Sequence, residues 1–459
     1  MERKTGPGGF LCGLSVALGR ICRAAGFGLV VGALALTPGT WVASAWADDD
    51  GDDGGGGGRG RGGGQRSERS ERSERNERKT FETKKKKAVQ QRKKKVAAKP
   101  APRPVVVALD LPEAGLTEAT RRGFTVLSDD TLQSVGVRVQ RLRLPRNMSV
   151  ATARNVLASL GAAESDVNSI YRPQEEDECA PSTPCSPLVL VDWPVNAELP
   201  CAASPVIGLV ETTVNTKDAS LAGQSVEVID LRPKGTARSG NAHGTAVAAL
   251  VAGSRGSNAE GLLPQARVIA AVPYYRSSGG NDVAQAFDVV RAVDALLRES
   301  PHVVNLSLAG PANAVIERVI KLTVAKGVPV VAAAGNAGSG SKPLYPAAYE
   351  DAVAVTAVSP TLRIYRRAPR GEHIDFAAPG VEVPVATGTG RVASRSGTSY
   401  AAPYVTAALA VMRLRSPDAP IADLVAELAR TARDLGEPGK DKVFGWGLLQ
   451  ADGICGNSG

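Results

Sequence analysis

From Leu188 onward, short runs of apolar residues alternate along the chain with longer segments in which apolar residues recur at helical spacing. The short runs are rich in valine, alanine and isoleucine, which is typical of strands buried on both faces of a parallel sheet. The expected strands are Val206–Glu211, Val226–Asp230, Val268–Val272, Val303–Ser307, Val328–Ala333 and Ala352–Val358, and the expected helices are His243–Ala252, Asp282–Glu299, Ala314–Lys326 and Thr398–Leu414. This alternation predicts an α/β domain over residues 188–459 with a doubly wound, mostly parallel sheet.

The segment before this domain has a pattern of its own and is expected to form a small α+β module over residues 105–174. Apolar residues indicate strands near 124–126, 137–144 and 167–171 and a helix at 149–160. Ser149 is the expected N-cap of that helix, because apolar residues recur behind it at helical spacing. Residues 175–187 are rich in proline and cysteine, which favours a linker between the module and the α/β domain.

The first 47 residues have the composition of an export signal. Basic residues precede an apolar run that starts at Ala24, and Ala45-Trp46-Ala47 offers the small residues that a signal peptidase recognises. An uncleaved membrane anchor is the alternative, because the apolar stretch is long enough to cross a bilayer. Both interpretations place the rest of the chain outside the cytoplasm. We therefore expect a secreted or periplasmic protein, which is membrane-anchored if the leader is not cleaved.

Residues 48–104 are of low complexity, with a glycine run, an Arg-Ser-Glu repeat and lysine clusters. They hold too few apolar residues to offset chain entropy, which indicates a disordered tail. The chain has a formal net charge of +9, but its positive excess lies in the leader and this tail, while residues 105–459 are close to neutral. The folded part is therefore not expected to bind nucleic acid. The tail is either a solvated linker or a contact to an anionic cell surface, and both interpretations stay open.

The cysteines that follow the leader are Cys179, Cys185, Cys201 and Cys455. An even number in an exported chain favours two disulfides, and four cysteines allow three pairings. Metal binding through these cysteines is disfavoured because no histidine lies near any of them in the sequence.

Three short motifs place polar groups at the ends of expected elements. His243 begins a helix of small residues, and Gly244 after it lets the helix start close beneath another segment. Ser399 lies at the start of another helix, where its backbone N–H can donate and small neighbours keep the hydroxyl accessible. Asn336 follows a buried strand, and its amide could donate to an oxyanion. Each residue alone would also suit a helix cap or a turn, so only their combination points to catalysis.

The motifs around these residues resemble the subtilisin family of serine endopeptidases. The matching motifs are His-Gly-Thr-Ala-Val-Ala at 243–248, Gly-Asn at 335–336 and Gly-Thr-Ser-Tyr-Ala-Ala-Pro at 397–403. The resemblance covers about residues 188–455. Residues 123–174 resemble the family's inhibitory propeptide more weakly. An α/β-hydrolase esterase is disfavoured because Ser399 lacks a Gly-x-Ser-x-Gly elbow. The sequence also lacks the His-Glu-x-x-His and Gly-x-x-x-x-Gly-Lys-Ser motifs of zinc proteases and P-loop NTPases.

The resemblance implies a serine endopeptidase that acts on polypeptide substrates. Ser399 would be the nucleophile and His243 the general base, while the Asn336 side chain and the Ser399 N–H would hold the oxyanion. The chain would be made as a precursor with its own propeptide-like module as a partner. We predict self-cleavage in the boundary Gln174–Ser186, where the proline- and cysteine-rich junction follows the module.

The resemblance also implies a site for an extended substrate. Ser307, Leu308 and Ala309 would pair with the substrate as an added strand, and Gly335 would be a further substrate-binding residue. The family usually has glycine where Ala309 stands. Because the extra methyl group changes the pocket, the sequence does not identify the substrate side chain that it prefers.

No cofactor is expected. Some family members bind structural calcium, but this sequence offers no acidic ligand cluster for it. We expect a monomer.

The acid departs from the family pattern. The family has Asp-Thr-Gly after its first apolar strand, whereas this chain has Glu211-Thr212-Thr213 there. A glutamate keeps the charge but carries it about 1.5 Å further from the strand, so the strand or the imidazole must shift to keep the hydrogen bond. Ser-His-Glu triads occur in serine hydrolases of another fold. Asp230 is the rival carboxylate, and a catalytically inactive binding or scaffolding domain is the alternative function.

Overall fold

The computed structural model describes residues 103–173, 186–194 and 204–454. The predicted leader, almost all of the low-complexity tail, most of the predicted cleavage boundary and the four cysteines lie outside these ranges. What the sequence predicts for them therefore stays a prediction. Among the described residues, no helix is long and apolar enough to cross a membrane.

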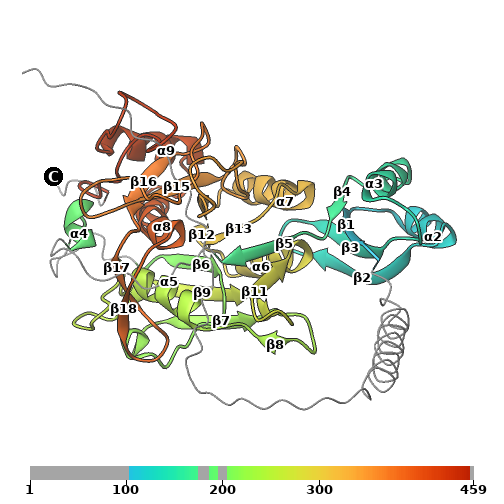
Figure 1. Ribbon diagram of the computed structural model, residues 1–459, viewed down its shortest axis with the longest axis horizontal. Helices are drawn as coiled ribbons and strands as arrows, with labels where there is room; N and C mark the ends of the chain where they lie inside the picture. Colours follow the sequence, from blue (N-terminus) through green and yellow to red (C-terminus); the bar gives the residue numbers. More distant parts are fainter. Residues whose placement is uncertain (1–102, 174–185, 195–203, 455–459) are drawn as a thin grey trace, which may run out of the picture. The chain divides into compact units, whose positions relative to one another are not determined.

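A seven-stranded sheet forms the centre of the α/β domain (Figure 1). Its strand order is β16-β15-β14-β12-β6-β9-β7, and every neighbouring pair is parallel. The strands are β6 (Val206–Val210), β7 (Val226–Asp230), β9 (Arg267–Val272), β12 (Val303–Leu306), β14 (Val330–Ala333), β15 (Val353–Val358) and β16 (Phe376–Pro379). The predicted α/β class with a parallel sheet is confirmed, and β16 is an edge strand that the sequence pattern missed.

Helices cover both faces of this sheet because its strands send alternate side chains to two cores. Ile207 and Leu209 of β6 belong to one core, and Val210 belongs to the other. The first core is covered by α5 (Ala242–Ala252), α8 (Thr398–Arg415) and α9 (Ile421–Thr431), and the second by α6 (Ala286–Leu297) and α7 (Ala314–Ala325). The helix α8 is buried over almost its whole length, so its first residues are held firmly.

The residues before this domain form an antiparallel sheet with the strand order β2-β3-β1-β4. Its elements are β1 (Val105–Leu109), α2 (Glu113–Arg121), β2 (Thr125–Leu132), β3 (Val137–Arg143), α3 (Val150–Ser159) and β4 (Glu164–Val167). Ser149 caps α3 by accepting from Thr152 N at 3.0 Å. One face of the sheet packs on α2 and α3, while Val107 and Val139 on the other face join the core of α6 and α7. The sequence pattern missed β1 and α2.

A second, smaller sheet joins this module to the α/β domain. Its order is β13-β5-β11-β10-β8, and its strands are β5 (Ile170–Pro173), β8 (Ala237–Arg238), β10 (Tyr275–Arg276), β11 (Asp282–Gln285) and β13 (Leu308–Ala309). The sequence pattern was wrong at residues 282–285, which it assigned to a helix. They form a strand because β5 and β10 supply backbone partners on either side. Only α6, which follows directly, is helical.

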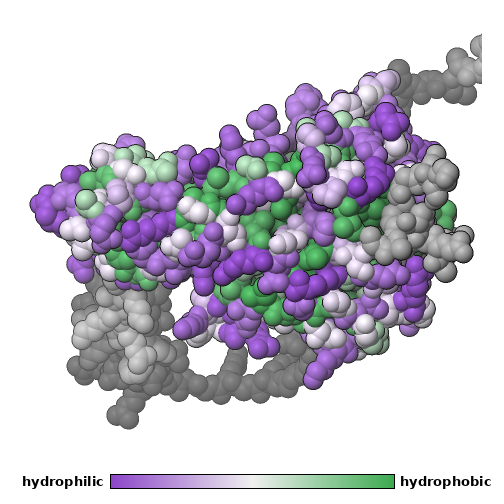
Figure 2. Space-filling model, turned by 180° about the vertical axis from the view of Figure 1, so that it is seen from behind, coloured by the Kyte–Doolittle hydropathy of each residue, from purple (hydrophilic) through white to green (hydrophobic). Residues whose placement is uncertain are grey.

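The remaining elements lie at the periphery. They are the short helices α4 (Pro187–Leu190) and η1 (Ala219–Leu221) and the hairpin of β17 (Val383–Ala386) and β18 (Val392–Arg395). On the face shown in Figure 2, hydrophilic residues cover much of the surface, with hydrophobic ones between them. The large exposed hydrophobic side chains among the described residues come from different elements: Val126, Val189, Val228, Val392 and Trp446.

Candidate active site

A buried carboxylate, an imidazole and a hydroxyl form a chain of hydrogen bonds. Glu211 Oε2 lies 2.8 Å from His243 Nδ1, and His243 Nε2 lies 3.0 Å from Ser399 Oγ. Their side chains are nearly excluded from solvent, with exposed fractions of 1%, 2% and 0%. The structure thus brings together three residues that are 32 and 156 positions apart in the sequence.

Strand and helix ends hold the first two of these groups. Glu211 follows β6 directly, and its backbone N–H donates to Ala271 O of the neighbouring β9 at 3.0 Å. His243 lies in the first turn of α5, where Gly244 N donates to Thr212 Oγ1 at 2.9 Å. A side chain at Gly244 would come within 2.4 Å of Thr212 O, so only glycine lets α5 approach this loop closely.

Asn336 is tied to the residue before Ser399. Its Oδ1 accepts from Thr398 N at 3.1 Å and from Thr398 Oγ1 at 3.2 Å, while Thr398 Oγ1 accepts from Gly335 N at 2.9 Å. Gly335 has a φ of 105°, which side chains rarely adopt, and it lies between β14 and Asn336. Because the amide oxygen is engaged in this way, the orientation of the Asn336 amide nitrogen is fixed as the donor end of the side chain.

A second buried chain of polar side chains ends at the backbone oxygen of Ser399. Thr406 Oγ1 donates to Asn305 Oδ1 at 3.0 Å, and Asn305 Nδ2 donates to Ser307 Oγ at 2.8 Å. Ser307 Oγ in turn donates to Ser399 O at 3.2 Å. Sequence reasoning found Ser307 but missed Asn305 and Thr406, since only the contact between β12 and α8 brings them together.

The strand β5 of the module occupies the groove beside this site. It pairs antiparallel with β13, where Leu308 faces Pro173 and Ala309 faces Arg172, and with β11 on its other side. A cavity of about 370 Å³ next to it is lined by His243, by residues of β10 and β11, and by Arg172 and Pro173. Leu308 and Ala309 therefore line the groove between β13 and β11 that β5 fills in this structure, and Ser307 directly precedes them in the chain.

Tyr171 of β5 anchors that segment. Its side chain is fully buried, and its hydroxyl donates to Pro311 O at 3.0 Å. Burial raises the pKa of Tyr171 far above its ordinary value, so the hydroxyl stays protonated. A methyl group at Gly310 would lie 2.5 Å from the Tyr171 ring, so the absence of a side chain at Gly310 makes room for it.

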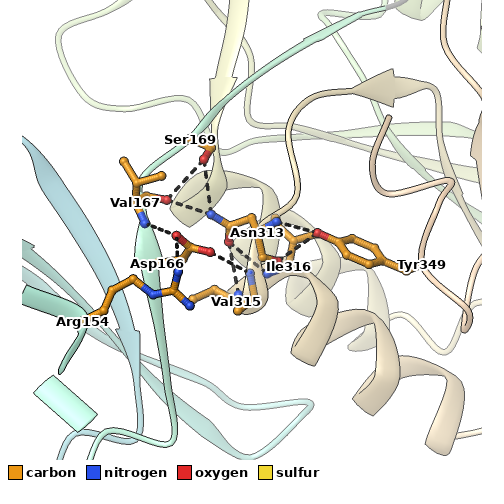
Figure 3. A network of polar contacts seen from close by, with 9 residues as sticks. Arg154, Asp166, Val167, Ser169, Asn313, Val315, Ile316 and Tyr349 are labelled. Carbon is orange, nitrogen blue, oxygen red and sulfur yellow. Dashed lines mark hydrogen bonds and ion pairs between the residues drawn. The ribbon is translucent and has the colours of Figure 1, made fainter. Parts of the chain in front are cut away.

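The end of β4 and the turn that follows it, residues Asp166–Ser169, bind the N-terminus of α7 (Figure 3). Asp166 Oδ2 accepts from Ala314 N at 3.2 Å, and Val167 O accepts from Asn313 Nδ2 at 2.7 Å. Asn313 itself caps α7 by accepting from Val315 N and Ile316 N. A carboxylate is favourable at this positive end of the helix, so the contact is electrostatic as well as geometric.

The same turn also binds the N-terminus of α6. Asn168 Oδ1 accepts from Phe287 N at 3.1 Å, and Ser169 O accepts from Ala286 N at 2.9 Å. The first backbone N–H groups of a helix have no partner within the helix, so those of α6 find theirs in the module. One turn of the module thus bridges two helices that cover the sheet.

The other candidates from the sequence lie elsewhere. Asp230 ends β7 and forms an ion pair with Arg232 at 3.1 Å, so the carboxylate that meets His243 is Glu211. His302 Nδ1 accepts from Val206 N at 3.0 Å, which is a structural contact, and burial lowers the pKa of His302. Within the described ranges, no group of three or more histidine, cysteine or acidic residues is placed to hold a metal ion.

Several known proteins are similar to this chain. Subtilisin Savinase of Lederbergia lenta is 34% identical over 46% of this chain and 77% of its own length. Thermitase of Thermoactinomyces vulgaris is 32% identical over 54% of this chain and 85% of its own length. The minor extracellular protease Epr of Bacillus subtilis (strain 168) is 31% identical over 46% of this chain, but the match spans only 32% of Epr.

The fold and the family agree with these likenesses. Fervidolysin of Fervidobacterium pennivorans, a keratinolytic enzyme related to subtilisin, superposes with a TM-score of 0.63 over 78% of this chain and 61% of its own, at 21% identity. That likeness supports the subtilisin-like fold. The profile of the subtilase family matches residues 202–447, more than half of the chain. The chain therefore belongs to the subtilase family, whose members include serine endopeptidases of the subtilisin type.

Proposed function

We propose that this protein is an exported serine endopeptidase in which Glu211, His243 and Ser399 act as the catalytic triad. The observation that carries the proposal is the unbroken hydrogen-bond chain from Glu211 Oε2 through both nitrogens of His243 to Ser399 Oγ. Asn336, tied to Thr398 beside the nucleophile, is the proposed oxyanion donor together with the Ser399 N–H.

The proposed reaction proceeds through an acyl-enzyme. Glu211 Oε2 accepts a hydrogen bond from His243 Nδ1, so the imidazole carries its proton on Nδ1. The other ring nitrogen, Nε2, is then free of a proton and acts as the base. Ser399 Oγ attacks the scissile carbonyl carbon as its proton passes to His243 Nε2. His243 then gives this proton to the leaving amine as the C–N bond breaks. A water molecule repeats the sequence on the ester, which releases the acid and restores Ser399.

A glutamate can serve here because one of its oxygens performs two tasks. Glu211 Oε2 accepts from Thr212 N at 3.0 Å as well as lying 2.8 Å from His243 Nδ1. The backbone N–H fixes the carboxylate, and the carboxylate fixes the imidazole. The longer side chain therefore still meets the ring, and we expect only a modest loss relative to aspartate.

The groove that holds β5 is the proposed substrate site. A polypeptide substrate would replace β5 and pair with β11 and β13 as an added strand. Its backbone would then pass Leu308 and Ala309 and approach Ser307, whose hydroxyl contacts Ser399 O. Ala309 is only 6% exposed, and we propose that its methyl group narrows the pocket for the side chain next to the cleaved bond.

The module is the proposed inhibitory propeptide, cut from the peptidase domain in the boundary Gln174–Ser186. Its β5 lies in the groove, and its turn Asp166–Ser169 binds α6 and α7, which supports this role. N-terminal sequencing of the secreted protein tests the cleavage. A mature terminus between residues 105 and 170 would contradict it, as would full-length chain that persists uncut.

Export is proposed from the leader, and it agrees with the word extracellular in the name of Epr. The tail of residues 48–104 is proposed as a linker that could also contact an anionic surface, which salt-sensitive release from cells would test. We propose that the peptidase is a monomer.

Fluorophosphonate labelling of the purified protein tests the triad. The native protein should be labelled, Ser399→Ala should not, and Glu211→Asp should be labelled faster. Labelling only in Glu211→Asp would mean that the native acid is ineffective. If none of the three is labelled once the module has been removed, the catalytic proposal is wrong and a binding role on a peptidase fold takes its place.

A further inference from the structure

The two carboxylate oxygens of Glu211 are treated differently by their surroundings. Oε2 accepts hydrogen bonds from Thr212 N and from His243 Nδ1. Oε1 is buried and has no hydrogen-bond partner among the described residues. A buried carboxylate oxygen without a donor has lost its hydration with nothing in return, so the position calls for a donor.

A donor of the right kind lies in the same region. Tyr274 comes two residues after the end of β9. β9 pairs in parallel with β6, the strand that Glu211 directly follows. Its side chain is 1% exposed, and its hydroxyl also lacks a hydrogen-bond partner among the described residues. Glu211 N donates to Ala271 O at the end of β9, which places the carboxylate's strand beside the segment that leads to Tyr274. Burial raises the pKa of Tyr274 well above its ordinary value, and the charge of Glu211 adds to the rise, so the hydroxyl is protonated and can donate.

We propose that Tyr274 is a positioning residue for the triad, whose hydroxyl supplies Glu211 Oε1 with its hydrogen bond through one buried water molecule. Two buried polar atoms, one a donor and one an acceptor, are thereby satisfied together. Since neither atom has a direct hydrogen-bond partner in the part of the chain that the structure describes, a bridge is the arrangement that serves both. The inference rests on the proposed catalytic role of Glu211.

This arrangement explains how the longer acid is held. With Oε2 alone engaged, the Glu211 side chain has one more rotatable bond than aspartate and can swing about that single anchor. A hydrogen bond to Oε1 fixes the plane of the carboxylate and hence the line from Oε2 to His243 Nδ1. An aspartate at 211 would draw the second oxygen back toward β6 and away from Tyr274, so the benefit of Tyr274 depends on the glutamate.

The Tyr274→Phe variant tests the inference because it removes one oxygen and keeps the ring. The full chain is expressed and allowed to process itself, and the resulting enzyme is assayed. We expect kcat to fall about tenfold with KM within twofold, since the substrate groove is unchanged. In the Glu211→Asp background, the same substitution should change kcat by less than twofold. This interdependence is what a purely structural role of Tyr274 would not produce.

Two outcomes would overturn the inference. An unchanged kcat in Tyr274→Phe means that Tyr274 does not position the triad. An equal loss in both backgrounds means that the hydroxyl serves another group, for which Asp282 is the candidate because its charge also acts on Tyr274.

Thermal unfolding of the Ser399→Ala chain provides a test that needs no activity. If the hydroxyl serves Glu211, Tyr274→Phe leaves a buried acceptor unpaired and lowers the unfolding midpoint. If the hydroxyl has no partner, its removal is neutral or raises the midpoint, and the inference is wrong. Should the native protein prove inactive, the catalytic proposal fails, but this measurement still decides whether Tyr274 and Glu211 interact.

Discussion

Replacing Asp288 by asparagine should remove a pH dependence from the unfolding free energy of the full chain. Asp288 lies in the first turn of α6 with an exposed fraction of 1%, and the neighbouring Phe287 ring is covered by Arg141 of the module at 4.8 Å. Burial raises the pKa of Asp288 to about 6, and Asp130 adds to the rise, while Arg141 and Arg291 act in the opposite direction.

The sign follows from the comparison with the unfolded chain, in which this carboxyl has its ordinary pKa near 3.8. Because the folded pKa is higher, the folded state binds the proton more tightly. The contribution of Asp288 to stability is fully present below the ordinary pKa and is lost as the pH rises through about 6. Between pH 5 and pH 7.5 the equilibrium constant for folding should fall about tenfold on this account, on the order of 1.4 kcal/mol.

Denaturant unfolding of the full chain measures this effect, with Ser399→Ala present in every sample to prevent self-cleavage. The stability difference between Asp288→Asn and its parent should shift by about 1.4 kcal/mol in favour of the variant from pH 5 to pH 7.5. Glu317→Gln is the matched control, since Glu317 lies in the first turn of α7 but is exposed. A difference for Asp288→Asn that does not vary with pH would refute the reasoning.

Two further substitutions probe the groove and the oxyanion donor. Gly310→Ala would place a methyl group 2.5 Å from the Tyr171 ring; activity should therefore appear sooner after processing, as followed by peptide hydrolysis against time, and an unchanged lag would contradict this anchor. Asn336→Ala should lower kcat by about 10²–10³ with little change in KM, which is the loss seen when one oxyanion donor is removed from subtilisin. A loss confined to KM in steady-state kinetics would instead mean that Asn336 binds the substrate.

Much of the fold could be predicted from local pattern. The runs that form β6, β9, β12, β14 and β15 are continuous and apolar because the sheet is covered on both faces, and such runs stand out in the sequence. β11 could not be predicted in the same way. Residues 282–285 form a strand because β5, more than a hundred positions earlier, lies beside them. A pairing partner that distant leaves no local trace.

The candidate site divides along the same line. His243, Ser399 and Asn336 are recognisable because each lies in a short motif at the end of an element. Tyr274 has no such motif. It stands in an ordinary run after β9, and only its buried hydroxyl, whose pKa the charge of Glu211 helps to raise, marks it. A residue that supports a catalytic group is brought to it by the three-dimensional structure. A short sequence motif therefore does not identify such a residue.

The groove gives inhibition and substrate recognition a common physical basis. β11 and β13 both pair with β5, and in the proposed reaction an extended substrate takes the place of β5 between the same two strands. Module and substrate then compete for one set of backbone hydrogen bonds. Cutting the chain after β5 would not by itself open the groove, because the contacts to α6 and α7 remain. Activity should begin when the module is lost, so a change that weakens its docking, such as Gly310→Ala, alters the onset of activity without touching Ser399.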